Sequence, residues 1–332
     1  MSNINTEEVS ARLRLKGIDV SRKAISITNF NGSNQEKDFQ EPANCNGYGR
    51  VRHFKLSASD GWPQNPLPIL PAAKALGLKP DSQIRAQVFQ NSICNWRCWY
   101  CFVDFSLLKG DEKHSSFLTA DELIELYLRE EAPPPMIDLS GGQPDLTPEW
   151  VPWVMESLSN KGLRDKVYLW SDDNLSNDYL WKYLTKEQID LMLNYKMYSR
   201  VSCFKGIDEE SFSINTKASP ELFRNQFKLC KRLIQTGFDL YGYITLTAST
   251  KTDFRSVVPR FLDELQTESE MFPLRIVPLE VKKYSPMTKR VDSVFQDMID
   301  GQYIAIKIWE EEMARRFTKE QLNVPITEVK YK

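Results

Sequence analysis

The sequence predicts an α/β protein built from parallel strands that alternate with helices. Six short apolar runs rich in β-branched and aromatic residues recur from residue 85 to residue 281, and helical segments separate them. Strands and helices in alternation form parallel βαβ units with right-handed crossovers. Such units either curl into a barrel or form an open, doubly wound sheet. In both arrangements ligand-binding residues gather in the loops after the carboxyl ends of the strands.

The elements can be placed by their local signals. The six predicted strands are residues 86–90, 136–139, 167–170, 200–204, 240–247 and 274–281. Helix starts are predicted at Thr119 with Glu122, Thr147-Pro148, Thr185 with Gln188, and Ser219-Pro220, because these are capping boxes or prolines at a first helical position. Further helices are expected over residues 253–265 and 293–316. We expect the last to be interrupted near Gly301, because glycine weakens a helix interior.

The first 84 residues form a predicted N-terminal extension with a different character. Residues 24–28 and 50–56 alternate well enough for short strands, whereas the proline-rich residues 61–68 suit neither a helix nor a central strand. We expect this extension to pack on the main domain and to cover part of its site. The expected domains are therefore the extension 1–84, a core 85–290 and a C-terminal helical segment 291–332.

Composition narrows the class of protein. The chain has 332 residues, 41% of them hydrophobic and 27% charged, with a net charge of -2. These values suit a soluble globular protein and argue against a general nucleic-acid surface. No apolar run approaches the length of a membrane span, and the polar, acidic start lacks the order of a signal peptide. We therefore expect a cytoplasmic protein that does not contact a membrane.

Three cysteines lie in one short loop directly after the first strand of the core. Cys94, Cys98 and Cys101 have the spacing C-x3-C-x2-C, which lets one loop surround a single inorganic cluster. Cysteine thiolates are the usual ligands of a four-iron cubane, and three of them leave one iron open. An open metal position is typical of a site that performs chemistry. The alternatives are a zinc knuckle, which would need a fourth ligand, and an accidental group of buried thiols.

The other three cysteines are too dispersed for a second cluster. Cys45 lies beside an Asn-Gly turn and is interpreted as a turn residue, while Cys230 falls on the apolar face of a predicted helix. Cys203 lies within a predicted strand and is expected to be a core residue. The sequence therefore predicts one cluster only.

Two polar segments follow the next strands of the core. The turn after residues 136–139 consists of Ser140, Gly141, Gly142, Gln143 and Pro144, and the segment after residues 167–170 consists of Ser171, Asp172, Asp173 and Asn174. Paired glycines let backbone groups approach a ligand closely. The short acceptors of the second segment can bind ribose hydroxyls or a cation. An ordinary βα loop and a helix-capping cluster are the simpler interpretations.

The form Cys-Asn-x-Arg-Cys-x-Tyr-Cys resembles the cluster motif of radical S-adenosylmethionine (radical SAM) enzymes. The resemblance implies a partial (βα)6 barrel similar to a TIM barrel, with one 4Fe–4S cluster on Cys94, Cys98 and Cys101 and SAM on the open iron. It places Tyr100 near the adenine. The turn resembles the family's Gly-Gly-Glu-Pro motif, which binds the methionine end of SAM, but this chain has Gln143 in place of Glu. The segment after residues 167–170 would bind the ribose side of SAM.

Residues 201–206 are similar to a strand of the activating enzymes of glycyl-radical proteins, in which the positions of Ser202 and Lys205 approach SAM. Residues 276–284 resemble a less specific segment of the same enzymes, which makes Glu280 a candidate substrate contact. The basic residues Lys282, Lys283, Lys289 and Arg290 either meet an acidic substrate or form a solvated face.

The resemblance implies an enzyme that cleaves SAM reductively and abstracts hydrogen from a substrate. An electron donor of the flavodoxin or ferredoxin type would supply the electron. The likeness to activating enzymes and maturases favours a protein or peptide substrate, with a nucleotide or another small molecule as the alternative. Proteins of another class that fit the cysteines are an iron–sulfur electron carrier and a zinc-binding module.

Overall fold

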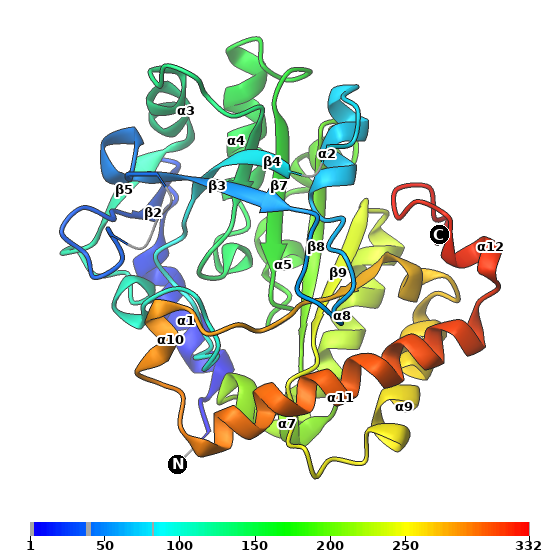
Figure 1. The fold of residues 1–332 in the computed structure, drawn as a ribbon. Helices are drawn as coiled ribbons and strands as arrows, with labels where there is room; N and C mark the ends of the chain where they lie inside the picture. Colours follow the sequence, from blue (N-terminus) through cyan, green and yellow to red (C-terminus); the bar gives the residue numbers. More distant parts are fainter. Residues whose placement is uncertain (1–2, 38–40, 82, 332) are drawn as a thin grey trace.

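The structure is a computed structural model that describes residues 3–37, 41–81 and 83–331, so part of the N-terminal extension lies outside the described residues. Among these residues, seven strands form one curled sheet in the order β10-β9-β8-β7-β6-β4-β3. In Figure 1, β7, β8 and β9 run down the molecule while β3 and β4 cross one end of the sheet. The predicted α/β class and partial barrel are confirmed.

The strands of the large sheet are β3 (Gly49–Lys55), β4 (Gln83–Phe89), β6 (Met136–Leu139), β7 (Tyr168–Asp173), β8 (Tyr198–Lys205), β9 (Leu240–Thr245) and β10 (Ile276–Pro278). All neighbours from β4 to β10 are parallel, and β3 is antiparallel to β4. A small antiparallel sheet contains β1 (Ile18–Asp19), β2 (Ala24–Thr28) and β5 (Ser115–Thr119). The N-terminal extension thus contributes one strand to the main sheet and two strands to the small one.

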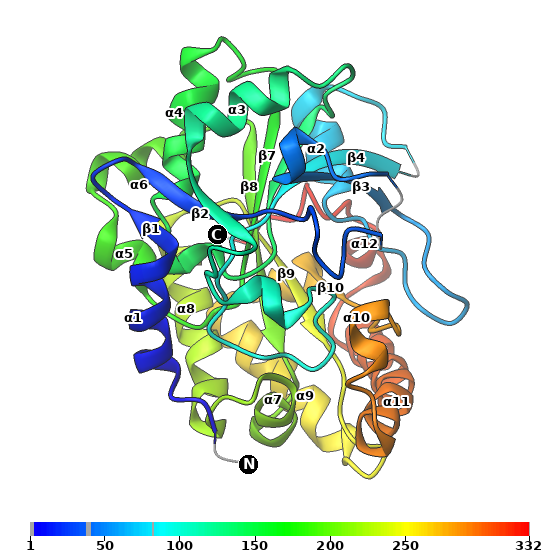
Figure 2. The same ribbon diagram turned by 90° about the vertical axis from the view of Figure 1, so that its left-hand side faces the viewer.

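The α-helices are α1 (Thr6–Gly17), α2 (Ile69–Leu76), α3 (Ala120–Leu128), α4 (Trp150–Asn160), α5 (Tyr179–Tyr183), α6 (Lys186–Leu193), α7 (Glu209–Thr216), α8 (Phe223–Thr236), α9 (Phe254–Glu268), α10 (Ser285–Thr288), α11 (Ser293–Arg316) and α12 (Lys319–Leu322). Short 3-10 helices are η1 (Cys45–Gly47), η2 (Phe105–Leu108), η3 (Pro144–Leu146), η4 (Pro220–Leu222) and η5 (Phe272–Arg275). Figure 2 shows α1 and α11 on opposite sides of the molecule. No helix in the described part of the chain is long and apolar enough to cross a membrane.

The local signals place most of these elements. Thr119 and Thr185 cap α3 and α6 with complete capping boxes, and Gly237 ends α8 in a left-handed conformation. Local patterns do not predict the helices α1, α2 and α7 or the strand β5, because these segments are short or weakly amphipathic. Thr147-Pro148 precedes α4 rather than opening it, since α4 begins at Trp150.

The expected interruption of the last helix near Gly301 is wrong. The helix α11 is continuous from Ser293 to Arg316. Gly301 is instead a contact point, because a Cβ atom there would lie 2.0 Å from the Ala248 carbonyl oxygen. Glycine is present so that the helix can approach the segment after β9, and the packing compensates for its low helix propensity.

Strand register decides which side chains face the inside of the curled sheet. Phe204 of β8 packs on Phe227 of α8 and Phe261 of α9, so its face is the outer, helix-covered one. Side chains alternate along a strand, and Cys203 and Lys205 therefore lie on the inner face. The register pairs Cys203 with Tyr243 of β9.

Candidate active site

The cysteine loop follows β4 and is held from outside by two other elements. The last residues of α7 accept its backbone amides, since Arg97 N donates to Thr216 O (3.1 Å) and Trp99 N donates to Asn215 O (3.2 Å). Trp99 Nε1 also donates to Asn215 Oδ1 at 2.8 Å. From the segment before α11, the Arg290 guanidinium donates to Cys101 O (2.8 Å) and Val103 O (2.9 Å). The loop is therefore anchored at both ends.

The three thiols lie within electrostatic reach of one another. Burial raises the pKa of Cys98 to about 12, and the neighbouring thiols Cys94 and Cys101 contribute to that rise. Burial also raises the pKa of Cys94 and of Cys101. Each thiol therefore resists ionisation until something binds the thiolate form.

Nearby cations lower the pKa values of the same thiols and so oppose the effect of burial. Lys205 of β8 lowers the pKa of all three thiols, Arg97 lowers that of Cys94 and Cys101, and Arg290 lowers that of Cys101. These three cations favour the thiolate form, which is the form that binds iron. Among the described residues, no group of three or more His, Cys, Asp or Glu side chains is arranged to hold a metal ion.

The glycine turn packs directly against the strand end that leads into the cysteine loop. A Cβ atom at Gly142 would lie 2.3 Å from Asn91 O and 2.4 Å from Ile93 O. Gln143 N donates to Ile93 O at 2.7 Å. Both glycines have positive φ, +79° at Gly141 and +63° at Gly142, which favours residues without a side chain. The two predicted motifs are therefore in backbone contact.

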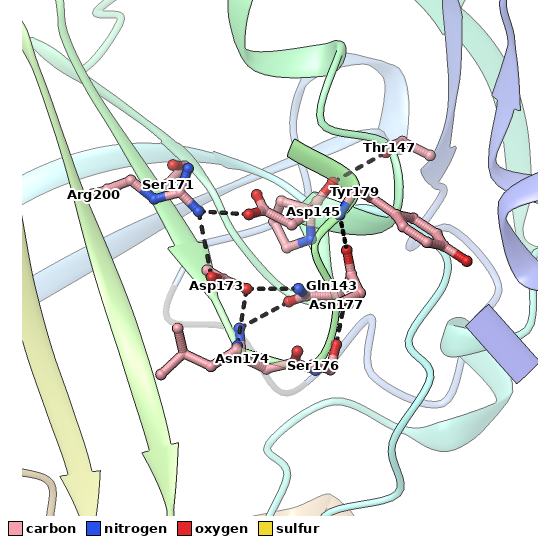
Figure 3. A network of polar contacts seen from close by, with 12 residues as sticks. Gln143, Asp145, Thr147, Ser171, Asp173, Asn174, Ser176, Asn177, Tyr179 and Arg200 are labelled. Carbon is pink, nitrogen blue, oxygen red and sulfur yellow. Dashed lines mark hydrogen bonds and ion pairs between the residues drawn. The ribbon is translucent and has the colours of Figure 1, made fainter. Parts of the chain in front are cut away.

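The side chain of Gln143 connects this turn to the polar segment after β7 (Figure 3). Gln143 Nε2 donates to Asp173 Oδ1 at 2.8 Å, and Gln143 Oε1 accepts the Asn174 amide at 3.0 Å. Asn174 Nδ2 in turn donates to Asn95 Oδ1 of the cysteine loop at 3.2 Å. One hydrogen-bonded chain thus joins the three predicted segments.

Asp173 is fully occupied on the outer side of the sheet. It accepts from Gln143 and from the Leu175 amide, and Arg200 Nη2 lies 3.5 Å from its Oδ2. The same guanidinium donates to Asp145 Oδ2 at 2.6 Å (Figure 3). The contacts of Asp173 are those of a residue that supports the loops.

The other predicted residues divide between the two faces. Asp172 shares the inner face with Lys205, by the register of β7 and β8. Ser171 and Ser202 lie on the outer face, where Ser171 Oγ and the Tyr198 hydroxyl are 2.8 Å apart. Ser202 is buried, and no described residue lies in hydrogen-bonding reach of its Oγ.

Three further predicted residues lie in or beside the cysteine loop and the glycine turn. The Tyr100 hydroxyl and Thr245 Oγ1 of β9 are 2.9 Å apart, which ties the cysteine loop to the inner face. Ser140 Oγ donates to Asp138 Oδ2 at 3.0 Å, and Pro144 begins η3 directly after the turn. Cys203, expected in the core, is buried on the inner face and lies near Lys205 and Asp172.

Sequence patterns do not indicate some residues of the site. Asn95 and Arg97 lie inside the cysteine motif, but nothing local marks their contacts. Asp138 lies two residues before Ser140 in a strand, and strand alternation could have placed it on the face that Asp172 shares. The contact of Arg290 with Cys101 spans 189 residues, so no local pattern could have indicated it.

Comparison with known proteins places this fold beside several solved structures. No protein-family model matches the sequence, and no curated protein matches it. Streptococcus suis SuiB bound to S-adenosylmethionine matches with 16% identity and a TM-score of 0.39, over 67% of this chain and 46% of SuiB. SuiB bound to the precursor peptide SuiA matches with 12% identity and a TM-score of 0.37, over 55% of this chain and 36% of SuiB.

A third structure, anSMEcpe with bound AdoMet, matches with 12% identity and a TM-score of 0.41, over 68% of this chain and 60% of anSMEcpe. Both SuiB and anSMEcpe have S-adenosylmethionine bound in these structures. The chain spans between about a third and a half of the length of the SuiB structures.

Proposed function

We propose that this protein is a radical SAM enzyme that holds one 4Fe–4S cluster on Cys94, Cys98 and Cys101. The observation that carries the proposal is the backbone contact between the glycine turn and the cysteine loop, in which Gln143 N donates to Ile93 O. An electron carrier or a zinc module would need only the cysteines. A ligand that bridges the cluster and the turn explains why both lie together at the carboxyl ends of β4 and β6.

The chain's own residues would bind and orient SAM. The backbone groups of the turn at Gly141 and Gly142, which is packed against the segment before Cys94, would bind the methionine end. Asp172 lies on the inner face within reach of the ribose side, and Lys205 offers a cation for the carboxylate. Tyr100, held by Thr245, would flank the adenine. When bound, the reduced cluster supplies the electron that splits SAM to a 5′-deoxyadenosyl radical.

The hydrogen donor is proposed to be a protein or peptide, on the likeness of residues 201–206 to activating enzymes. A nucleotide or other small molecule is the alternative substrate. A cytoplasmic electron donor of the flavodoxin or ferredoxin type would reduce the cluster. The domain division into 1–84, 85–290 and 291–332 belongs to the same proposal.

The test is reconstitution of the whole chain with iron and sulfide without oxygen. We expect about four irons per chain and formation of 5′-deoxyadenosine from SAM under dithionite. Replacing Cys94, Cys98 and Cys101 together with alanine should abolish both. The matched control is Cys230→Ala, which removes a buried thiol outside the loop and should retain both. Zinc without iron in the wild-type protein, or 5′-deoxyadenosine from the triple variant, would contradict the proposal.

A further inference from the structure

A cavity of about 480 Å³ lies beside the cysteine loop. Phe102, the residue after Cys101, forms part of its wall. The lining residues come from the N-terminal extension with β3, from the cysteine loop, and from the end of the segment after β10 with the first turn of α10. They are Gln35, Arg50, Val51, Arg52, His53, Phe102, Lys283, Tyr284, Ser285 and Pro286. The cavity thus lies between two elements that are distant in the sequence and next to the proposed cluster.

The charged side chains that line this cavity are basic among the residues that the structure describes. Arg50, Arg52 and His53 come from β3 and Lys283 from the opposite wall, and no described aspartate or glutamate lines the cavity. His53 is already paired, since its Nε2 lies 2.6 Å from Glu41 Oε1. A cavity lined in this way attracts anions and disfavours cations.

Arg52 is oriented for an anion by aromatic rings. Its guanidinium carbon lies 4.3 Å from the centre of the Phe54 ring and 5.5 Å from that of Phe102. Within the described part of the chain it makes no ion pair with a carboxylate. Stacking on two rings leaves the N–H edge of a guanidinium available for a bidentate contact with carboxylate or phosphate.

Two neighbouring lysines of the basic run after β10, Lys282 and Lys283, have different surroundings. Lys282 Nζ lies 3.3 Å from Glu280 Oε2, and Glu280 also accepts from the Tyr303 hydroxyl at 2.8 Å. Lys283, one residue later, lines the cavity. Among the described residues it has no carboxylate partner. Glu280 is therefore engaged within the chain, and Lys283 is the lysine that is available to a ligand in the cavity.

Two carboxylates, Asp138 and Asp172, lie on the inner face of the sheet near Arg52. Asp138 of β6 is 1% exposed, and its Oδ1 has no hydrogen-bond partner among the described residues. Arg52 interacts electrostatically with both Asp138 and Asp172. A buried acceptor without a partner costs free energy unless a ligand or water satisfies it. Asp172 interacts electrostatically with Lys205 as well as with Arg52, so charged groups of the inner face connect the cavity with Lys205.

We propose that this cavity binds an anionic group of the substrate, a carboxylate or a phosphate, between Arg52 of β3 and Lys283 after β10. The bound group holds the remainder of the substrate over the inner face, beside the cysteine loop. The identification of this ligand as the substrate rests on the proposed function. The anion site itself rests only on the cavity and its cations.

The test compares two pairs of probes that differ in charge, by isothermal titration calorimetry at fixed ionic strength with the full chain. One pair is the peptide acetyl-Ala-Glu-Glu-Ala-amide and its Gln-Gln analogue. The other is adenosine monophosphate and adenosine. We expect the charged member of at least one pair to bind about tenfold or more tightly than its neutral partner, the effect of one charge-assisted hydrogen bond. Binding in the peptide pair identifies a carboxylate ligand, and binding in the nucleotide pair a phosphate ligand.

The variants Arg52→Gln and Lys283→Gln should each remove most of that preference. Lys282→Gln, which removes the same charge one residue away, should leave it intact. The proposal is overturned if neither charged probe is preferred, or if the preference survives both cavity substitutions. Formation of 5′-deoxyadenosine in the same preparations reports the proposed function separately. If no 5′-deoxyadenosine forms while anion binding is retained, the proposed radical SAM function is refuted and the anion site is not.

Discussion

At the scale of single residues, the amide of Gln143 is required by its neighbours. Asn174 N donates to one end of this side chain, so that end must be an oxygen, and the other end must donate to the Asp173 carboxylate. A glutamate would satisfy the first contact and would face Asp173 with a second negative charge. The departure from Gly-Gly-Glu-Pro is therefore a local adaptation to Asp173, and the backbone of the turn is unaffected by it.

This pairing predicts the effect of Gln143→Glu. The two carboxylates would meet at the present 2.8 Å separation in a buried site, so we expect a loss of about 2 kcal/mol in the free energy of unfolding. Adding Asp173→Asn restores a donor–acceptor pair, and the double variant should be more stable than the sum of the single effects by about 1 kcal/mol. Urea unfolding of the four proteins measures both values. Strict additivity would show that residues 143 and 173 are not coupled.

At the scale of elements, the site depends on how closely the turn after β6 approaches the end of β4. Gly142 allows that approach because two carbonyl oxygens, those of Asn91 and Ile93, occupy the space of its missing side chain. The first cysteine of the loop, Cys94, directly follows Ile93. Any displacement of the turn therefore moves the base of the cysteine loop.

We predict that Gly142→Ala destabilises the protein by about 3 kcal/mol, because it combines a steric clash with a strained positive φ. The matched control is Gly162→Ala. Gly162 has φ +67°, but a Cβ atom added there would have no atom within 4 Å, so this variant isolates the backbone strain at about 1 kcal/mol. The urea concentrations at the unfolding midpoints of the two variants and the wild-type protein give the comparison. Equal losses of unfolding free energy in the two variants would show that the steric clash at residue 142 adds nothing to the backbone strain.

At the scale of the whole molecule, the N-terminal helix α1 contacts the cysteine loop. Ser10 of α1 accepts from Asn95 Nδ2 of the cysteine loop at 2.9 Å, and Thr6 Oγ1 accepts from Trp96 Nε1 at 3.1 Å. Arg14 attaches the same helix to the core, through the Leu146 carbonyl and the buried carboxylate of Glu149. The helix α1 therefore supports the cysteine loop, whereas the expectation that the extension covers part of the site stays a prediction.

Replacing Arg14 with alanine should loosen this attachment. It leaves the buried Glu149 without its cation, and breaking a buried ion pair costs about 3–5 kcal/mol. Arg12→Ala, on the exposed side of α1, should change stability by less than about 0.5 kcal/mol. Thermal or urea unfolding distinguishes the two. A small effect at Arg14 would show that the ion pair with Glu149 does not hold α1 in place.

Much of the chain's architecture is determined by local sequence. The capping boxes at Thr119 and Thr185 mark helix starts locally, because each satisfies amides in the first turn of its own helix. The six parallel strands and the spacing of Cys94, Cys98 and Cys101 are likewise local patterns. These patterns predict the class, the strand order along the chain and the loop most suited to a cluster.

Only the tertiary structure decided which neighbouring residues act together. Asp172 and Asp173 are adjacent in sequence, yet register places one on the inner face and ties the other to Gln143 and Arg200. Arg290 reaches Cys101, and Arg52 and Lys283 meet around one cavity, across separations that no local pattern spans. The physical reason is that strand pairing and helix packing, which bring distant residues within hydrogen-bonding distance, depend on the whole chain.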